Sequence, residues 1–167
     1  MEHTRDAAAE LAQMAREVVD SNPYLVLGTA DENGLPRVTP VFFGHDGYRD
    51  FYWVSRPDTN HSLHVSQRPT VNAVIYDSTV HVGHGRAVYL TGRARQVTDA
   101  ELADRCQVAF RPLAGAHGFA PDQLSGDAPL RLYLLPVDVW ELYVGYANPG
   151  HADGPERRVP VWPAGAA

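Results

Sequence analysis

The sequence from residue 24 to residue 43 reads Tyr24-Leu25-Val26-Leu27-Gly28-Thr29-Ala30, Asp31-Glu32-Asn33-Gly34-Leu35-Pro36 and Arg37-Val38-Thr39-Pro40-Val41-Phe42-Phe43. The outer two runs are rich in residues that favour strands, and the Asn-Gly pair between them favours a tight reversal of antiparallel strands. Pro40 has no amide hydrogen to donate. We therefore expect the second strand to lie at a sheet edge or at a bulge.

The rest of the chain continues this pattern. Further β-rich runs cover 51–55, 71–76, 86–97, 131–135 and 137–144, and Pro136 either separates the last two or marks a bulge. Helices are expected from Thr4 to about residue 20, over 59–67, and from a capping box at Thr98 and Glu101 to about Phe110. Residues 78–85 and 111–129 read as loops, the second mobile, and 145–167 as a surface tail.

Strands joined mostly by short turns, with few helices, predict a mostly β fold. A closed or nearly closed antiparallel barrel suits it best, because closure removes exposed sheet edges. At 167 residues we expect a single domain over 1–167, with an N-terminal helix in 1–22 and a barrel core in 24–144.

Charge and composition narrow the class of partner. The net charge is −6, and no basic run exceeds the pair Arg157–Arg158, which argues against nucleic acid and against anionic membranes. Cys106 is the only cysteine, so there is no intrachain disulfide. The N-terminus lacks the apolar core of a signal peptide, and no apolar run could span a bilayer. We expect a cytoplasmic protein.

Three features could carry chemistry. The first is the junction Trp53–Ser62, where a strand ends, a polar loop follows and a helix begins, so that free backbone amides could bind an anion. Donors to a phosphate group could come from Ser55, Arg56, Thr59, Asn60, His61 and Ser62. The alternative is an ordinary helix cap made by Asp58 or Thr59.

The second feature is the edge strand Arg37–Phe43, whose unpaired backbone groups could bind a flat heterocycle; the alternative is a plain strand with a bulge. The third is the pair His61 and His64, three residues apart on a helix. That pair could chelate a transition metal, but no third ligand is positioned by the sequence. We predict no metal site.

The order of several motifs resembles the pyridoxamine 5'-phosphate oxidase-like family, the FMN-binding split barrels. They are Thr29–Phe42, Phe51–Ser55, His61-Ser62-x-x-Val65, Arg68-Pro69-x-Val71 and Tyr76–Thr79. The likeness is to the short bacterial members. It implies a six-stranded antiparallel split barrel and a homodimer, with FMN at the subunit interface and a small-molecule substrate.

The resemblance also implies site residues. Thr39, Pro40 and Val41 would line the flavin ring and ribityl chain, and Trp53, Val54 and Ser55 would continue that wall. Thr59, Asn60, His61 and Ser62 would face the phosphate, while Arg86 and Ala87 would reach the flavin from the other subunit. No catalytic residue is assigned.

This sequence departs from the true oxidase at the positions that bind phosphate and substrate. Thr39 stands in place of an arginine, Asp58-Thr59 replace an Arg-Lys pair, and the C-terminal Arg-x-His signature is missing. Arg56, Arg37 or His61 could substitute for the lost cations. We therefore expect a flavin-dependent oxidoreductase other than a true pyridoxamine 5'-phosphate oxidase. The alternatives are a protein that binds the deazaflavin coenzyme F420, a haem protein with His61 or His84 as axial ligand, and a flavin-binding dimer without turnover.

Overall fold

A computed structural model describes residues 2–110, 118–147 and 157–162, with side chains from residue 8 onward. The elements, in chain order, are α1 (Glu2–Ser21), β1 (Tyr24–Ala30), β2 (Pro36–Phe42), β3 (Gly44–Asp46), β4 (Asp50–Ser55), α2 (Asn60–Gln67), β5 (Thr70–Tyr76), β6 (Arg86–Arg93), β7 (Arg95–Gln96), η1 (Asp99–Glu101), α3 (Leu102–Ala109), η2 (Pro121–Leu124), β8 (Arg131–Val144) and β9 (Arg158–Pro160).

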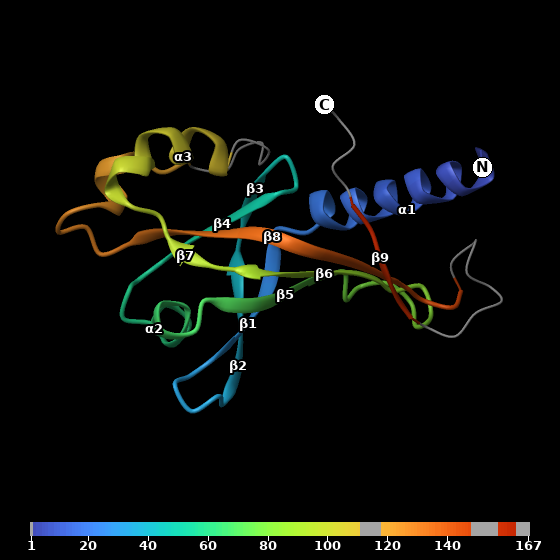
Figure 1. The fold of residues 1–167 in the computed structure, drawn as a ribbon, viewed down its shortest axis with the longest axis horizontal. Helices are drawn as coiled ribbons and strands as arrows, with labels where there is room; N and C mark the ends of the chain where they lie inside the picture. The colour runs from blue at the N-terminus through green and yellow to red at the C-terminus, as the bar shows by residue number, and fades with distance from the viewer. Residues whose placement is uncertain (1, 111–117, 148–156, 163–167) are drawn as a thin grey trace.

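The strands form one curled antiparallel sheet in the order β2-β1-β5-β6-β8-β4-β3, with β7 and β9 pairing at the sides of β8. Figure 1 shows this sheet flanked by α1 and α3 on one side and α2 on the other, with the β1–β2 hairpin projecting away from the body. The strand β2 lies at an edge, as Pro40 predicted. The fold is the expected split barrel with flanking helices.

Strand β8 joins the two parts of the sheet. Residues 131–136 pair with β4, and residues 137–144 pair with β6. Pro136, which has no amide hydrogen to donate, stands at this change of partner, and the β6 register shifts between Thr91 and Gly92. A Cβ atom on Gly92 would lie 2.1 Å from the Pro136 carbonyl oxygen, so the crossing requires glycine.

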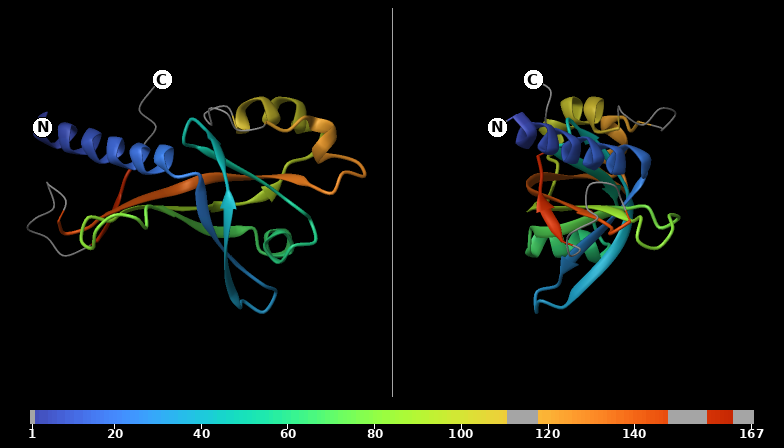
Figure 2. Two further views of the ribbon diagram at one scale, coloured as in Figure 1. Left: turned by 180° about the vertical axis from the view of Figure 1, so that it is seen from behind. Right: turned by 90° about the vertical axis from the view of Figure 1, so that its right-hand side faces the viewer.

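The core has two parts. The larger fills the curled sheet beneath α1, whose Ala15, Val18 and Val19 are buried, as expected of a helix covering the core. Figure 2 shows α1 lying along this face in two further views. The smaller core packs α3 and η2 on the outer part of β4 and β8, with Leu124 only 1% exposed.

Several predicted elements need correction. The described residues contain six long strands, as expected, and three short ones; of the short strands, β3 and β9 were not predicted, whereas β7 lies inside the predicted run 86–97. The run 86–97 is two strands broken at Ala94, because that residue bonds to Pro69 instead of continuing the ladder. The runs 131–135 and 137–144 are one strand, β8.

Two predicted irregular segments contain regular structure. Residues 118–129 hold η2, whose Leu124 is buried, and residues 111–117 lie outside the described part of the chain. Within the predicted tail 145–167, β9 pairs with β8, while 148–156 and 163–167 lie outside it. In the part of the chain that is described, no helix is long and apolar enough to cross a membrane.

Candidate functional site

Helix α2 is held in place by a buried hydrogen bond to the sheet. His64 Nδ1 lies 3.0 Å from Thr29 Oγ1 on β1, and the two residues are 7% and 5% exposed. Val65, on the same buried side of α2, packs into the larger core. The first turn of α2 is thereby set beside the end of β4.

A cluster of three hydroxyl groups and one imidazole forms where β4 ends and α2 begins. Ser55 Oγ lies 2.8 Å from His61 Nε2, and Thr59 Oγ1 lies 3.2 Å from the same nitrogen. Thr59 Oγ1 also donates to Ser62 Oγ at 2.9 Å and lies 3.3 Å from Ser55 Oγ. The structure thus brings together four of the residues predicted to face a phosphate.

The first turn of α2 keeps its backbone amides free of side-chain caps. Thr59 is the N-cap residue, but its side chain makes no cap hydrogen bond. The Asp58 carboxylate pairs with Arg56 instead, at 2.8 and 3.0 Å. Because the first N–H groups of a helix have no partner within the helix, they can bind an anion. The ordinary helix cap, considered as the alternative, is therefore absent here.

Burial lowers the pKa of His61. Its exposed fraction is 9%, and desolvation, followed by the charge of His64, lowers its pKa from the ordinary value. The imidazole is therefore neutral at neutral pH and can exchange hydrogen bonds with the surrounding hydroxyls. A dianion placed against it would favour the charged form instead.

The arginines expected to substitute for the cations of the true oxidase are Arg56 and Arg37. Arg56 pairs with Asp58, and a further arginine beside α2, Arg68, donates to the Glu32 carbonyl oxygen at 2.9 Å. Arg37 lies exposed on the edge strand β2. The residues present fit a phosphate group through hydroxyl, imidazole and backbone donors more than through cations. Neutral donors form weaker hydrogen bonds than charged ones, so we expect modest affinity.

The side chains that were predicted to line the flavin ring do not all face the same way. Val41 and Trp53 are buried in the larger core, at 8% and 0% exposure, so their side chains face inward. Thr39 is half-buried on the same face of β2 as Val41, whereas Pro40 is exposed on the opposite face. Val54 is half-buried against the smaller core. Asn60 is exposed at the start of α2.

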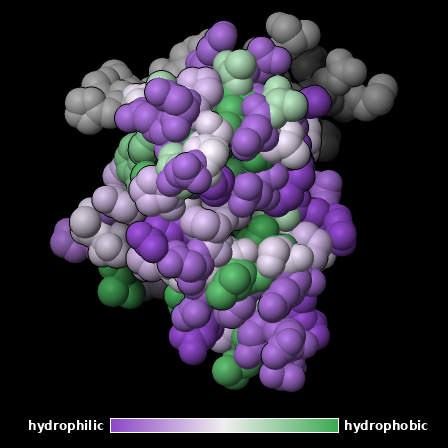
Figure 3. All heavy atoms as spheres, turned by 90° about the vertical axis from the view of Figure 1, so that its left-hand side faces the viewer, coloured by the Kyte–Doolittle hydropathy of each residue, from purple (hydrophilic) through white to green (hydrophobic). Residues whose placement is uncertain are grey.

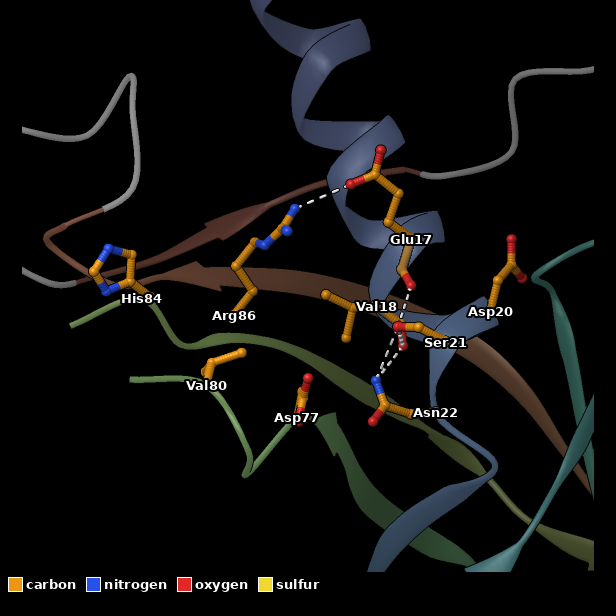
Figure 4. A pocket seen from close by; sticks show the side chains of 9 residues that line it. All are labelled: Glu17, Val18, Asp20, Ser21, Asn22, Asp77, Val80, His84 and Arg86. Carbon is orange, nitrogen blue, oxygen red and sulfur yellow. Dashed lines mark hydrogen bonds and ion pairs between the residues drawn. The ribbon is translucent and has the colours of Figure 1, made fainter. Parts of the chain in front are cut away.

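Arg86 and Ala87 lie away from this cluster. They begin β6, at the end of the molecule opposite α2 in the views of Figures 1 and 2. Arg86 reaches α1, where Nη1 lies 3.0 Å from Glu17 Oε2, and it lines a cavity of about 500 Å³ between α1 and the segment before β6 (Figure 4). One copy of the chain does not bring both groups of residues into one site.

Sequence reasoning missed a cavity of about 340 Å³ beside α2. Its lining includes the buried pair Ser62 and Tyr133 together with Arg95 and Gln96. Ser62 hydrogen-bonds Tyr133 and thus links this cavity to the hydroxyl cluster. Tyr133 follows Ser62 by 71 positions in the sequence, and only the pairing of β4 with β8 brings them close.

No group of three or more His, Cys, Asp or Glu side chains suited to a metal occurs in the described residues. One ring nitrogen of each histidine has a separate partner, since His61 Nε2 lies beside Ser55 Oγ and His64 Nδ1 lies beside Thr29 Oγ1. Their spacing on α2 therefore places the two rings against different neighbours.

Comparisons with solved structures confirm the fold. A haem-binding protein from Mycobacterium smegmatis matches with a TM-score of 0.67 and 19% identity, over 92% of this chain and 57% of that protein. A protein from Clostridium acetobutylicum related to general stress protein 26, of the pyridoxinephosphate oxidase family, matches with a TM-score of 0.62 and 14% identity, over 90% and 96%. HutZ, the haem storage protein of Vibrio cholerae, matches with a TM-score of 0.55 and 17% identity, over 78% and 91%.

None of the curated protein sequences matches this chain. The family model for pyridoxamine 5'-phosphate oxidase matches residues 11–143, which include every strand from β1 to β7 and nearly all of β8. The chain therefore belongs to the pyridoxamine 5'-phosphate oxidase-like family.

Proposed function

We propose that this protein is a homodimeric FMN-binding flavoprotein and a flavin-dependent oxidoreductase acting on a small molecule. The observation that carries the proposal is the hydroxyl–imidazole cluster of Ser55, Thr59, His61 and Ser62 at the uncapped first turn of α2. Such a cluster offers several donors to one phosphate group. Bound FMN would supply the redox chemistry, and the protein would supply binding and orientation.

The dimer is part of the proposal because the predicted site is divided within one chain. The cluster lies at α2 and Arg86 at the opposite end of the sheet (Figure 1), so a shared site needs a second copy. Apolar side chains on the projecting hairpin support an interface: Leu35 is 59% and Val38 is 74% exposed. Figure 3 shows hydrophobic residues among hydrophilic ones on this lobe. We place the dimer in the cytoplasm, since its single cysteine suits a reducing compartment.

Haem binding is the second candidate. It is favoured by the structural likeness to the haem-binding protein and to HutZ, and by His84, which lines the 500 Å³ cavity. In that cavity Glu17 and Arg86 neutralise each other, and the remaining carboxylates of Asp20 and Asp77 would repel haem propionates. The deazaflavin F420 carries an anionic tail, which suits a chain of net charge −6 poorly. FMN therefore remains the better proposal.

The test is a visible absorption spectrum of the purified protein, with mass spectrometry of what heat releases. Ser55→Ala and His61→Ala are expected to weaken FMN retention several-fold, since each removes a donor or acceptor of the cluster. Ser66→Ala and His81→Ala are matched controls, because the exposed Ser66 hydroxyl donates to the Leu63 carbonyl oxygen of its own helix and His81 is exposed in a loop. Unchanged FMN retention in both site variants would contradict the proposal that the cluster binds the phosphate group.

Turnover is tested separately. FMN-loaded protein is mixed anaerobically with NADH or NADPH, and bleaching of the flavin band is followed. Bleaching supports the oxidoreductase, whereas a flavin that no donor reduces supports the binding dimer without turnover. A Soret band in place of the flavin spectrum would support haem.

A further inference from the structure

The face of the sheet away from the larger core carries three tyrosines around one small residue. In the ladder, Tyr76 on β5 pairs with Ala87 on β6, and Ala87 pairs with Tyr143 on β8. Paired residues share a face, so a tyrosine stands on each side of Ala87. Neighbouring strands lie about 4.8 Å apart, which separates the two tyrosine positions by about 10 Å. Ala87, 7% exposed, forms the floor between them.

Tyr89, two residues along β6, lies on the same face and forms one end of the hollow. The structure shows a cavity of about 300 Å³ at this place, lined by Tyr76, Tyr89, Tyr143 and Ala87, with Val74, Asp77, Gly85 and Arg86 at its sides. A space between aromatic rings on adjacent strands suits a group that binds ring faces. Organic cations bind in this way, because ring faces carry negative charge.

One of the three rings, that of Tyr89, already contacts a cation of the chain itself. Arg158, on β9, pairs in register with Tyr143, and its guanidinium carbon lies 3.6 Å from the centre of the Tyr89 ring. Arg158 also approaches Glu141 at 3.9 Å, and 52% of its side chain is exposed. It therefore covers Tyr89 from the solvent side and could be displaced by a competing cation.

The two charged residues that line the hollow, Arg86 and Asp77, leave one negative charge there, which opposes the positive charge of Arg158 at Tyr89. Arg86 is neutralised by Glu17, and Figure 4 shows it turned toward α1. Asp77 accepts hydrogen bonds from the Thr79 amide and hydroxyl at 2.8 and 2.6 Å, which lower its pKa and keep it ionised. Among the side chains that the structure describes, those of residues 8–110, 118–147 and 157–162, no cation pairs with Asp77. Its carboxylate is the uncompensated charge of the lining.

We propose that this hollow binds a small organic cation with a methylated ammonium head, held by Tyr76, Tyr89 and Tyr143 and attracted by Asp77. As a binding site it stands on this chain alone. A role of this cation as the substrate rests on the proposed function. Arg86 and Ala87 line the hollow, and they are the residues expected to reach the flavin of the other subunit.

The experiment titrates the full chain with choline by calorimetry. The comparison ligand is the uncharged analogue in which a tert-butyl group replaces the trimethylammonium group. Choline is expected to bind saturably and about tenfold more tightly than the analogue, because only the cation gains from the rings and from Asp77. Equal affinity for the two ligands would overturn the proposal.

Variants then test the assigned residues, with circular dichroism to confirm folding. Tyr89→Leu and Asp77→Asn should each weaken choline binding about fivefold. Arg158→Ala should strengthen it about threefold, since it removes the competing guanidinium from Tyr89. Arg157→Ala, the exposed neighbour, should leave it unchanged. An Arg158→Ala affinity equal to that of Arg157→Ala, or lower, would contradict the assignment.

The same titration is repeated with saturating FMN, and flavin binding is followed by fluorescence. Choline binding without FMN binding would remove the proposed function and leave the cation site standing. FMN binding without choline binding would overturn the cation site and leave the proposed function standing. Loss of choline binding on adding FMN would also overturn the cation site, because the flavin itself would then fill the hollow.

Discussion

Ser55 Oγ lies 2.8 Å from His61 Nε2, and this contact joins the last residue of β4 to the first turn of α2. Thr59 Oγ1 lies within reach of both groups and continues the network to Ser62. Four polar side chains from one short stretch thus point at one place. A second buried pair, His64 with Thr29, fixes the helix that carries them.

Removing the Thr29 hydroxyl should destabilise the protein. Thr29→Val keeps the shape but leaves His64 Nδ1 buried without that partner, which costs about 1–3 kcal/mol of unfolding free energy. Urea denaturation measures the loss. Thr91→Val is the matched control, because Thr91 Oγ1 donates to Asn72 Oδ1 at an exposed position. An equal effect of the two substitutions would contradict the structural role of the buried pair.

Gly92→Ala should also be destabilising, for a steric reason. The new methyl group would lie 2.1 Å from the Pro136 carbonyl oxygen, so the backbone of β6 or β8 must shift. Overpacking of this kind costs about 1–3 kcal/mol, seen as a lower midpoint of thermal unfolding. Gly118→Ala, where no atom of the described residues lies within 4 Å of the added Cβ, should change the midpoint little. A Gly92→Ala protein as stable as the Gly118→Ala protein would show that β6 and β8 have room for a methyl group where Gly92 approaches Pro136.

The main strands could be predicted because their signals are local. Alternation, Asn-Gly and the edge proline Pro40 placed β1 and β2 correctly, and the Thr98–Glu101 capping box is present, with the Thr98 amide donating to the Glu101 carboxylate at 3.1 Å. The continuity of β8 through Pro136 could not be foreseen. It depends on a change of pairing partner, which is a tertiary property.

The part of the candidate site that depends on local sequence could also be predicted. Ser55, Thr59, His61 and Ser62 lie within eight residues of one another, so a strand–loop–helix junction was enough to gather them. The inward direction of Trp53 and Val41 follows from which face of the sheet is buried, and the link from Ser62 to Tyr133 follows from strand order. Neither is contained in the local sequence.

Stability should fall as the solution becomes acidic. Burial is the main cause that lowers the pKa of both His45 and His61 in the folded protein; Asp20 opposes the effect at His45. The unfolded chain therefore binds more protons, so the stabilising contribution is present above the ordinary histidine pKa of about 6.5 and is lost as pH falls through the folded values.

Urea denaturation between pH 7.5 and 5 measures this loss. Each histidine contributes a slope of at most about 1.4 kcal/mol per pH unit. His45→Gln and His61→Gln should each reduce the slope, whereas His81→Gln, exposed in a loop, should not. A slope unchanged by both buried substitutions would assign the acid sensitivity to other groups.

FMN affinity should rise as pH falls from 8 to 6.5, in the opposite sense to stability. The phosphate dianion placed beside His61 would favour the imidazolium form, whereas burial in the free protein favours the neutral form. Binding would then take up as much as one proton, and affinity would increase by at most about tenfold per pH unit. Fluorescence titration measures it, with riboflavin, which lacks the phosphate, as the matched ligand. His61→Gln should remove the pH dependence for FMN and leave riboflavin unaffected. A pH dependence equal for FMN and riboflavin would place the phosphate away from His61.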